Sequence, residues 1–496
     1  MKILVLNPPF LPKFSRPQRS PAVTKSGTLY YPIWLAYCVA VLEADGFEVV
    51  FWDAPAAGKS AEDALELVRR ESFDLAVLDA STPSVASDAA LAGRIKAASP
   101  GTFTVMAGSH VSAMPVETLA LDQGLDAVAR REYEYTIREL ARLLRDRKDR
   151  GEAAAGPDFM EALSRIAGLS FRGADGVVHN PDRPFIENLD ELPWVAPVYK
   201  KHLNFRHYFN ANAPPPMVTL ITSRGCPFRC GFCVYPQTLT GRAFRLRSVD
   251  DAVDEAAWCL ESFPGLRSIF FEDDTLTANK KRCLEFCDRI LSRGLKFAWV
   301  ANSRADLDAE TLRVMKAAGC RMLCVGFESA DKNSLAAMHK GVSVESMRRF
   351  AALAKKAGIL THGCFIFGFP GETESGILKT IEFALSLPID TAQFYPVMVY
   401  PGTEAYDEYL ARGWITADDF SKWLTPEGLH NCVVRNENLS PGQLVRLCDL
   451  ARRKFYLRPG YVAKKLARAL VSPAEMARTA RAGGVFVKHL FRGSRV

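Results

Sequence analysis

The chain has 496 residues, enough for two or three domains that each bury an apolar core. Its composition, 48% apolar and 24% charged, excludes a disordered or fibrous protein. The net charge of +7 is unevenly placed: from Ala451 to Val496 the chain carries 12 Lys/Arg and one acidic residue, and the rest carries 51 Lys/Arg against 55 Asp/Glu.

The first residues, "MKILVLNPPF", enter an apolar strand-like stretch directly, without the charged region and cleavage site of a signal peptide. The longest uncharged run, Ser26 to Leu42, contains glycine, proline and threonine and is short for a bilayer span. The 12 cysteines are scattered rather than arranged as a disulfide framework. These features predict a soluble protein of a reducing compartment, the cytoplasm.

Residues 1–150 alternate strand-like and helix-like segments, which predicts a doubly wound, Rossmann-like parallel sheet. Ligands of such sheets bind beyond the carboxyl ends of the strands. Those ends carry small and polar residues that suit a large polar cofactor. The predicted strands are "KILVLN", "EVVFWDAP", "LAVLDAST", "FTVMAGSH" and "AVAR".

Residues 151–216 are predicted to form a connector with a hairpin that turns at Gly173 to Gly176. A second alternating series over 217–420 predicts a partial (β/α)6 barrel, with its chemistry at the carboxyl ends of the strands. Residues 421–496 are expected to be mostly helical and basic. The predicted barrel strands are "VTLITSRG", "SIFFEDD", "FAWVANS", "MLCVGFE", "GCFIFGF" and "AQFYPVMV". The fold class expected is therefore α/β throughout.

A cysteine-rich turn, "RGCPFRCGFCVYP", follows the first barrel strand and contains Cys226, Cys230 and Cys233. A structural zinc site needs four ligands, whereas three thiolates can bind three irons of a [4Fe–4S] cluster and leave one corner open. Zinc binding and inert thiols remain the alternatives. The other nine cysteines are predicted to be core residues.

The C-x3-C-x2-C spacing, with Phe232 before the last cysteine, resembles the radical S-adenosylmethionine (radical SAM) superfamily. The resemblance implies that the three cysteines bind a [4Fe–4S] cluster whose fourth iron binds the amino and carboxylate groups of SAM. An electron from the cluster would cleave SAM to methionine and a 5′-deoxyadenosyl radical. Phe232 matches the aromatic residue of the motif.

Three other strand ends are similar to SAM-binding stretches of that superfamily. "GCFIFGFPGET" resembles the fifth-strand adenine motif, although Cys364 stands where many members have glycine, and a plain glycine turn would explain the stretch equally well. "ANSR" and "VGFES" would hold the ribose and methionine ends of SAM by the same resemblance. The residues implied are Ser303, Arg304, Glu328, Ser329, Ile366, Gly368, Gly371 and Glu372.

The second barrel strand ends in "FEDDT", which places Glu272, Asp273 and Asp274 together. In related enzymes an acidic cluster there faces SAM or substrate, so these three are the candidate catalytic residues. A solvated acidic loop is the alternative.

The N-terminal segment resembles the cobalamin-binding domain of the B12-binding radical SAM class. Its loops "DASTPSVASD" and "AGSHVSAMP" are similar to cofactor loops of that class, which implies cobalamin contacts from Ser81, Thr82, Gly108, Ser109 and His110. Since no histidine lies in a D-x-H-x-x-G pattern, none from that motif is expected beneath cobalt. For His110, a hydrogen bond to the cofactor and plain loop packing both remain open.

The segment "ARREYEY", residues 129–135, departs from the glycine-glutamate-glycine-glutamate pattern of many members. Arg131 and Tyr133 replace the two glycines. Their larger side chains would fill space that a nucleotide tail needs.

A narrower resemblance covers "HNPDRPFIENLDELP", the cysteine turn and "LRPGYVAKKLARALVSPAEM". These are similar to radical SAM proteins of hopanoid biosynthesis associated with the cyclitol ether of bacteriohopanetetrol, and members of that group also tend to lack the glycine pair. This implies ring contraction of the amino-sugar head group of a hopanoid lipid. A cobalamin-dependent radical SAM C-methyltransferase shares every motif and is the alternative; a non-catalytic cluster protein is a third reading.

The expected partners are a hopanoid lipid or another small-molecule substrate and a flavodoxin or ferredoxin-type reductant. No nucleic acid is expected, because the basic tail lacks interleaved aromatic residues. In that tail, "YVAKKLARALV" spaces Val462, Leu466 and Leu470 four apart, as in a helix on an anionic membrane surface. Packing on the body of the protein is the alternative to this peripheral contact at the inner membrane face.

Overall fold

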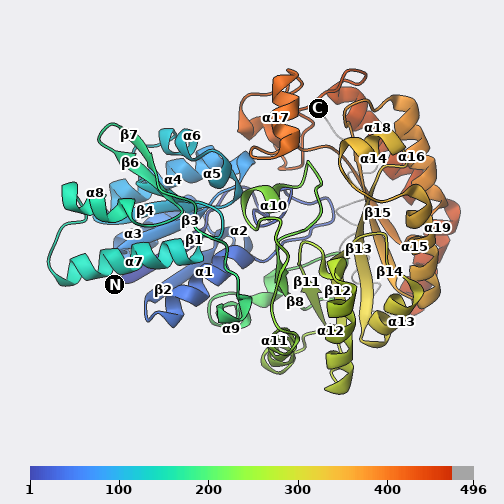
Figure 1. Cartoon of the computed structure of the whole chain (residues 1–496), viewed down its shortest axis with the longest axis horizontal. Helices are drawn as coiled ribbons and strands as arrows, with labels where there is room; N and C mark the ends of the chain where they lie inside the picture. Colours follow the sequence, from blue (N-terminus) through green and yellow to red (C-terminus); the bar gives the residue numbers. More distant parts are fainter. Residues whose placement is uncertain (472–496) are drawn as a thin grey trace.

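The computed structural model describes residues 1–471, which form two α/β domains whose sheets lie side by side (Figure 1). The first sheet has seven strands in the order β2-β1-β3-β4-β5-β6-β7, of which β1 to β5 are parallel. Their bounds are β1 (Lys2–Asn7), β2 (Glu48–Asp53), β3 (Leu75–Asp79), β4 (Phe103–Ala107), β5 (Ala127–Ala129), β6 (Leu169–Gly173) and β7 (Gly176–His179).

Helices cover both faces of this sheet, which explains why β3 and β4 are buried along their whole length and mostly apolar. On β1, Ile3 and Val5 join the core under one set of helices, and Leu4 and Leu6 join the core under the other. The strand order reverses at β1, so the crevice between the carboxyl ends of β1 and β3 is the expected ligand position. The helices are α1 (Ile33–Ala44), α2 (Ala54–Ala57), α3 (Ala61–Glu71), α4 (Val85–Ala98), α5 (Ser109–Ala113), α6 (Pro115–Ala120), α7 (Glu134–Asp149) and α8 (Pro157–Ser164).

The hairpin expected in the connector is formed by β6 and β7, but it pairs antiparallel with β5 and extends the first sheet. The three-residue β5 would otherwise leave its backbone groups unpaired at the sheet edge. In space, therefore, the first domain continues past residue 150.

The second sheet contains all six strands expected from the sequence, in the order β15-β14-β13-β12-β11-β8, and every pairing is parallel. Since β8 and β15 do not pair, the barrel is open. A short antiparallel ribbon, β9 (Ser223–Arg224) with β10 (Arg245–Leu246), encloses the cysteine turn. The barrel strands are β8 (Met217–Leu220), β11 (Ser268–Phe271), β12 (Ala298–Ser303), β13 (Cys320–Glu328), β14 (Leu360–Phe367) and β15 (Thr391–Pro396).

The free edge of β15 is covered by α18 (Pro441–Tyr456), which starts at a capping box formed by Ser440 and Gln443. Tyr456 Oη accepts from the backbone N–H of Ala392 at 3.0 Å and donates to its carbonyl at 2.6 Å. A side chain thus satisfies edge groups that a neighbouring strand would satisfy in a closed barrel. The remaining helices are α9 (Ala196–His202), α10 (Val234–Thr238), α11 (Val249–Ser262), α12 (Lys280–Ser292), α13 (Ala309–Ala317), α14 (Lys332–Ala337), α15 (Val344–Ala357), α16 (Glu374–Ser386), α17 (Glu404–Ala411) and α19 (Pro459–Val471).

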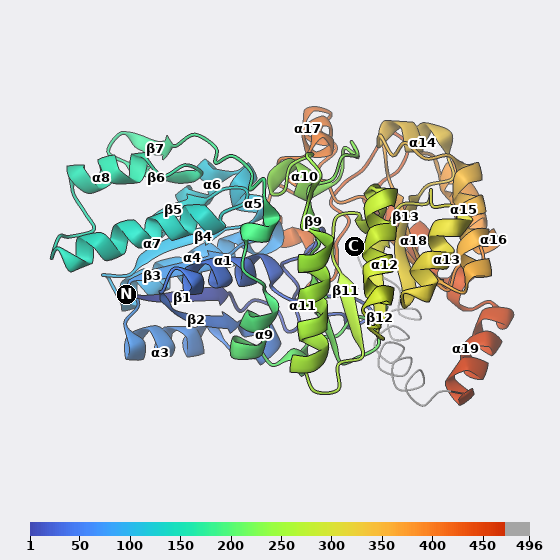
Figure 2. The ribbon, with the colours of Figure 1, turned by 60° about the horizontal axis from the view of Figure 1, so that its bottom comes forward.

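The basic helix expected near the C-terminus begins as α19, which projects from the barrel side of the molecule (Figure 2). Val462 on this helix is 41% exposed. The side chains of Leu466 and Leu470, and the tail from residue 472, lie outside the described residues. Within residues 1–471, no helix combines the length and apolar character of a membrane span.

Candidate functional site

The carboxyl edge of the first sheet faces the barrel, and a long segment after β1, residues 8–32, crosses from one to the other. Its Arg19 binds residues that follow β11, and Ser20 Oγ lies 3.0 Å from Tyr400 Oη and 2.9 Å from His430 Nε2. Helix α10, which carries on from the cysteine turn, lies between the two sheets (Figure 1). The residues predicted for two different cofactors therefore border one interdomain region.

The cysteine turn has a backbone fixed by hydrogen bonds from three directions. The N–H of Cys226 donates to the carbonyl of Gly241 at 3.3 Å, that of Gly231 to Met338 at 3.3 Å, and that of Ala405 to Gly231 at 3.1 Å. Gly225 has a φ of +83°, and a Cβ there would lie 2.1 Å from the Ala243 carbonyl oxygen. Only glycine fits immediately before the first cysteine.

Cys226, Cys230 and Cys233 are free and partly buried. Burial raises the pKa of the Cys226 and Cys233 thiols, and the charge of Asp274 adds to the rise at both. Thiolates would therefore need a bound cation at this position.

Within the part of the chain that the structure describes, no three His, Cys, Asp or Glu side chains are grouped to hold a single metal ion. A [4Fe–4S] cluster makes a different demand, because each thiolate binds its own iron. Three free thiols on one rigid turn fit that demand.

The three carboxylates after β11 have different surroundings. Asp273 is fully buried, and its Oδ1 accepts from the Thr222 N–H at 3.0 Å, the Thr222 hydroxyl at 2.9 Å and the Ser223 hydroxyl. These bonds fix the turn after β8 through one carboxylate oxygen, and the other, Oδ2, is buried without a hydrogen-bond partner. Glu272 and Asp274 instead bind Arg19.

Arg19 is a site residue that the sequence did not reveal. Its Nη1 lies 2.9 Å from Glu272 Oε1, its Nη2 lies 2.9 Å from Asp274 Oδ1, and its guanidinium lies 5.4 Å from the centre of the Tyr235 ring. Burial raises the pKa of Glu272, and the charge of Arg19 opposes that rise. A lone arginine in a segment without periodicity gives no sequence signal.

The end of β13 carries a buried ion pair between Glu328 and Lys340, at 2.7 Å. Glu328 adopts a left-handed φ of +63° at a register shift between β13 and β14, a strained conformation that is typical of functional sites. Its Oε2 has no hydrogen-bond partner. Lys340 was not predicted; it lies on the loop between α14 and α15.

Arg304 connects this pair to the cysteine turn. Its Nη2 donates to the carbonyl of Lys340 at 2.7 Å, and its guanidinium lies 3.7 Å from the centre of the Phe228 ring, within the turn. Glu272 Oε2 and Glu372 Oε1 are buried and have no hydrogen-bond partner, as is also true of Glu328 Oε2. Unsatisfied buried carboxylate oxygens around the turn fit a ligand with amino and hydroxyl groups, as SAM has.

Two serines predicted to bind SAM have hydrogen-bond partners within the protein. Ser303 Oγ lies 3.0 Å from Thr277 Oγ1, and Ser329 Oγ lies 3.2 Å from Thr380 Oγ1 while accepting from the Asp331 N–H at 3.1 Å. Since Ser329 is also fully buried, its hydroxyl packs the strand end onto α16.

The stretch after β14 follows the glycine pattern for reasons of packing. Ile366 is buried, and Gly368 has a φ of +111° with its N–H donating to Glu372 Oε2 at 2.5 Å. A Cβ at Gly368 would lie 2.9 Å from Leu444. Burial raises the pKa of Glu372 to about 7, although the Gly368 and Phe369 N–H groups lower it.

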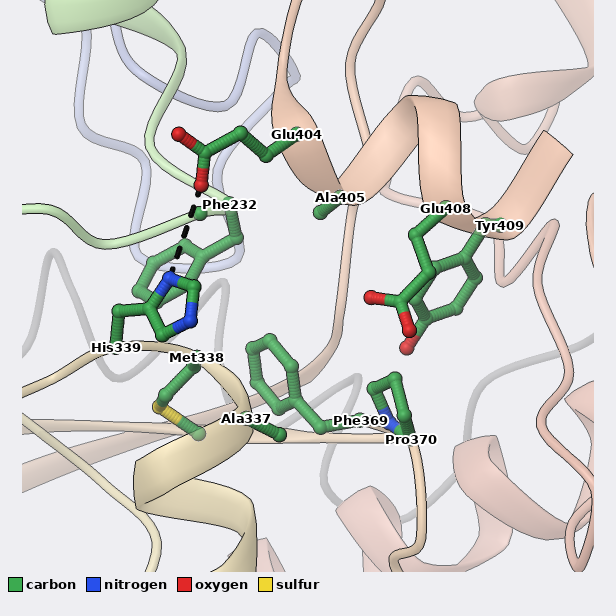
Figure 3. Close-up of a pocket in the computed structure, with 11 residues that line it drawn as sticks. Phe232, Ala337, Met338, His339, Phe369, Pro370, Glu404, Ala405, Glu408 and Tyr409 are labelled. Atoms are coloured by element: carbon green, nitrogen blue, oxygen red, sulfur yellow. Dashed lines mark ion pairs between the residues drawn. The ribbon is translucent and has the colours of Figure 1, made fainter. Parts of the chain in front are cut away.

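A small pocket lies beside the cysteine turn, between this turn, the end of α14 and the start of α17 (Figure 3). Phe232 packs edge-to-face on Phe369 there, with ring centres 5.5 Å apart. His339 and Glu404 form an ion pair at its rim, 3.7 Å apart. Two residues of the cysteine turn, Gly231 and Phe232, line this pocket.

At the first sheet, the residues predicted to contact cobalamin gather after β3 and β4. Ser81 Oγ lies 2.8 Å from Ser84 Oγ, and His110 Nδ1 lies 3.1 Å from Thr82 Oγ1. Gly108 has a φ of +126°, and a Cβ there would lie 2.4 Å from the Ala80 carbonyl oxygen. Ser109 is partly buried and starts α5.

The contacts of His110 favour the interpretation that it packs the loop. Besides Thr82, its ring meets Phe420 edge-to-face at 5.0 Å. Burial lowers the pKa of His110 to about 4, so the imidazole is neutral at neutral pH.

Several buried charges at this edge were not predicted. Arg16 binds Asp88 at 2.6 Å, with neither side chain exposed, and Nη1 of Arg16 donates to Asn7 Oδ1 at 2.9 Å. Burial raises the pKa of Asp79 to about 7 and that of Asp53 to about 6. A carboxyl with such a pKa is suited to donate a hydrogen bond to a polar ligand.

At the domain interface, Tyr133 Oη is buried and has no hydrogen-bond partner, and the Trp34 and Tyr235 rings pack edge-to-face with centres 5.7 Å apart. Burial, with the neighbouring charge of Asp79, raises the pKa of the Tyr133 phenol. A cofactor with amide side chains, such as cobalamin, would satisfy such an atom.

Tyr133 itself fills space, as its bulk suggested, since it is only 2% exposed. Arg131 keeps the left-handed backbone of the glycine it replaces, with a φ of +60°, and turns its side chain to Asp182 at 2.7 Å. Of the two replacements, only Tyr133 therefore occupies the interface.

Comparison with known families gives two matches. The radical SAM superfamily matches residues 220–384, and the B12 binding domain matches residues 19–141. The first match contains the cysteine turn and β11 to β14, and the second contains β2 to β5. Both expectations drawn from resemblance are therefore confirmed at the level of the superfamily.

Among individual relatives, an uncharacterized methyltransferase of Pyrococcus horikoshii is 31% identical over 467 residues, 94% of this chain and 95% of the relative. The anaerobic magnesium-protoporphyrin IX monomethyl ester cyclase of Rubrivivax gelatinosus is 26% identical over 440 residues, 87% of this chain and 74% of the cyclase. The hopanoid C-3 methylase of Methylococcus capsulatus is 26% identical over 325 residues, 64% of this chain and 56% of the methylase.

Among solved structures, TsrM from Kitasatospora setae, a radical S-adenosylmethionine methyltransferase with cobalamin and a [4Fe–4S] cluster bound, aligns with a TM-score of 0.65. The alignment covers 90% of this chain and 81% of TsrM at 19% identity. The likeness shows that the two chains share a fold from the first sheet to the barrel.

Proposed function

Because the chain belongs to the radical SAM superfamily, in the class with an N-terminal B12-binding domain, we propose that it is a cobalamin-dependent methyltransferase acting on an unactivated carbon of a small molecule. Its cofactors are a [4Fe–4S] cluster, SAM and cobalamin. The observation that carries the proposal is a contact between the two domains. Arg19, from the segment after β1, binds Glu272 and Asp274, which follow β11 beside the cysteine turn. Its relative of similar length in Pyrococcus horikoshii, named a methyltransferase, supports the choice of reaction.

In this proposal, Cys226, Cys230 and Cys233 would hold the cluster, which would supply the electron for SAM cleavage, and the first sheet would hold cobalamin, which would supply the methyl group. Glu328 holds the amino group or ribose hydroxyls of SAM, since one carboxylate oxygen is already fixed by Lys340 and the other is unpartnered. Arg304 is held over Phe228 and keeps Lys340 in place.

The wall of the substrate space is built by the residues around Arg19. Its ion pairs with Glu272 and Asp274 neutralise two carboxylates that would otherwise be buried unpaired. Apolar side chains at the strand ends, such as Phe365 and Phe367, are fully buried and help to exclude water from the region.

The test is an anaerobic incubation of reconstituted protein with SAM, cobalamin, a reductant and membrane lipid extract, followed by mass spectrometry of the nucleosides. A methyltransferase that uses both cofactors forms 5′-deoxyadenosine and S-adenosylhomocysteine together, with one methyl group added to a lipid. If neither nucleoside exceeds the level of a protein without its three cysteines, the proposal fails.

Ring contraction of a hopanoid head group is the second candidate, favoured by the three sequence stretches that resemble cyclitol ether proteins. It predicts 5′-deoxyadenosine without S-adenosylhomocysteine. Since the relative from Methylococcus capsulatus is named a hopanoid methylase, a hopanoid substrate is compatible with either reaction.

A lipid substrate would also give the basic C-terminal region a purpose. Val462 is exposed on α19, and 12 Lys/Arg follow Leu450. We propose that this region binds an anionic membrane surface, with the substrate presented from the bilayer.

A further inference from the structure

A cluster of four buried charges connects the cysteine turn to the cobalamin-binding domain. Arg224 and Arg245 are cross-strand partners in the ribbon of β9 and β10, which encloses the turn. Glu132 lies between β5 and α7, and Glu134 is the first residue of α7, in the segment where glycines are replaced. The four are called the interdomain clamp below.

The contacts of the clamp are close and numerous. Arg224 Nη2 lies 2.6 Å from Glu134 Oε1, and Arg224 Nη1 lies 3.4 Å from Glu132 Oε1. Both terminal nitrogens of Arg245 bind Glu132, at 2.8 and 2.7 Å. A bidentate fork of this kind fixes orientation as well as distance.

The clamp is dry. Its four side chains are between 1% and 9% exposed, so water does not screen the pairs. The guanidinium of Arg224 also lies 4.6 Å from the ring centre of Tyr37 and 5.3 Å from that of Trp34, both on α1. Glu134 occupies the first turn of α7, where the helix dipole favours a carboxylate.

Both arginines act directly on the cysteine turn. Arg224 is two residues before Cys226, and Arg245 Nη2 donates to the carbonyl of Thr240, on the return path of the turn, at 2.7 Å. Arg245 Nη1 also donates to the Ile186 carbonyl at 2.6 Å. The turn is therefore attached to the other domain at its entry and at its exit.

We propose that the interdomain clamp fixes the cysteine turn on the cobalamin-binding domain, with Arg224 as a positioning residue that sets the separation between cluster and cobalamin. Buried ion pairs add little net stability, because desolvation offsets their attraction, but they select one geometry. Two cofactors held by different domains need such a constraint to act on one substrate carbon. The statement about cobalamin rests on the proposed function; the attachment of the turn does not.

The first test needs no cofactor: hydrogen–deuterium exchange of the full chain over the turn, residues 226–240. Glu134→Gln and Arg224→Gln should raise the exchange rate there about tenfold or more, because a buried charge loses its partner. Arg224→Lys, which keeps the charge but cannot reach Glu132 and Glu134 with separate nitrogens, should lie between them and the wild type. The matched control is Glu255→Gln, which breaks a similar buried pair at 2.5 Å between α11 and Arg247, in the segment after β10.

The second test measures the cofactors directly, by pulsed electron paramagnetic resonance of protein holding reduced cluster and cob(II)alamin. The wild type should show one narrow distribution of spin–spin distance, the clamp variants a broadened one, and Glu255→Gln the wild-type distribution. Wild-type exchange and wild-type coupling in Arg224→Gln would overturn the proposal. A wild type without bound cobalamin would contradict the proposed function, and the exchange experiment would still decide the role of the clamp.

Discussion

Cys226, Cys230 and Cys233 owe their arrangement to neighbours that are not cysteines. Gly225 allows the entry to the turn, Asp273 fixes the hydroxyls before it, and the backbone of Gly231 is bonded on both sides. The cysteines were predictable because their spacing is local in sequence. The contacts from Asp273, Met338 and Ala405 were not, since these residues are distant from the turn in sequence.

Replacing Cys226, Cys230 or Cys233 by alanine should remove most of the bound iron and the visible absorbance of the cluster, while the protein stays soluble. The turn lies at a barrel rim, so the core is unaffected. Iron analysis after anaerobic reconstitution measures the loss, with Cys259→Ala, in the core under α11, as the control. A triple variant with wild-type iron content would contradict the assignment.

Glu328 and Ser329 are adjacent, and the proposed function gives them different roles. Glu328→Gln should weaken SAM binding by about tenfold or more, because a charge-assisted hydrogen bond is lost. Ser329→Ala should leave SAM binding unchanged and lower the free energy of unfolding by about 1 kcal/mol, through the lost bond to Thr380. Calorimetric titration with SAM separates the two; equal effects would place Ser329 at the ligand.

Asp79 should make the stability of the cofactor-free protein dependent on pH. Its folded pKa of about 7 lies above its unfolded value, so its contribution is full below about pH 4 and is lost as the pH rises through 7. Asp79→Asn should therefore reduce the fall in unfolding free energy between pH 5 and 8 by about 2 kcal/mol. Denaturant unfolding at both pH values measures it, and an unchanged slope would exclude a raised pKa.

At the scale of elements, the pattern of apolar residues in the sequence predicted the strands but not all of their pairings. Every strand expected in residues 1–150 and in the barrel is present, because buried parallel strands are continuous apolar runs. The hairpin β6–β7 was found, but its pairing with β5 depends on an edge that the sequence does not reveal. Residues 8–32, which carry Arg16 and Arg19 into both halves of the site, lack any periodic pattern and were missed.

The basic region that starts with α19 should bind anionic lipid. Replacing Lys464, Lys465 and Arg468 together by glutamine should weaken binding to vesicles containing phosphatidylserine by about tenfold or more, since each basic residue contributes about 1 kcal/mol. Vesicle sedimentation measures this, with zwitterionic vesicles as the control. Equal binding of both proteins would show that this helix serves another purpose.

At the scale of the whole molecule, function depends on how two ordinary folds face each other. The doubly wound sheet and the open barrel both place ligands at strand carboxyl ends, and the segment after β1 with the interdomain clamp holds those ends together. The sequence predicted each half from local motifs. It did not predict the interface, because Arg19 and Arg224 pair with residues distant in the chain.

The measurement that tests the central claim most directly is the nucleoside analysis of the anaerobic reaction with SAM, cobalamin, reductant and lipid extract. We expect 5′-deoxyadenosine and S-adenosylhomocysteine to accumulate together, with a methylated lipid. 5′-Deoxyadenosine without S-adenosylhomocysteine would contradict methyl transfer and favour rearrangement of the substrate.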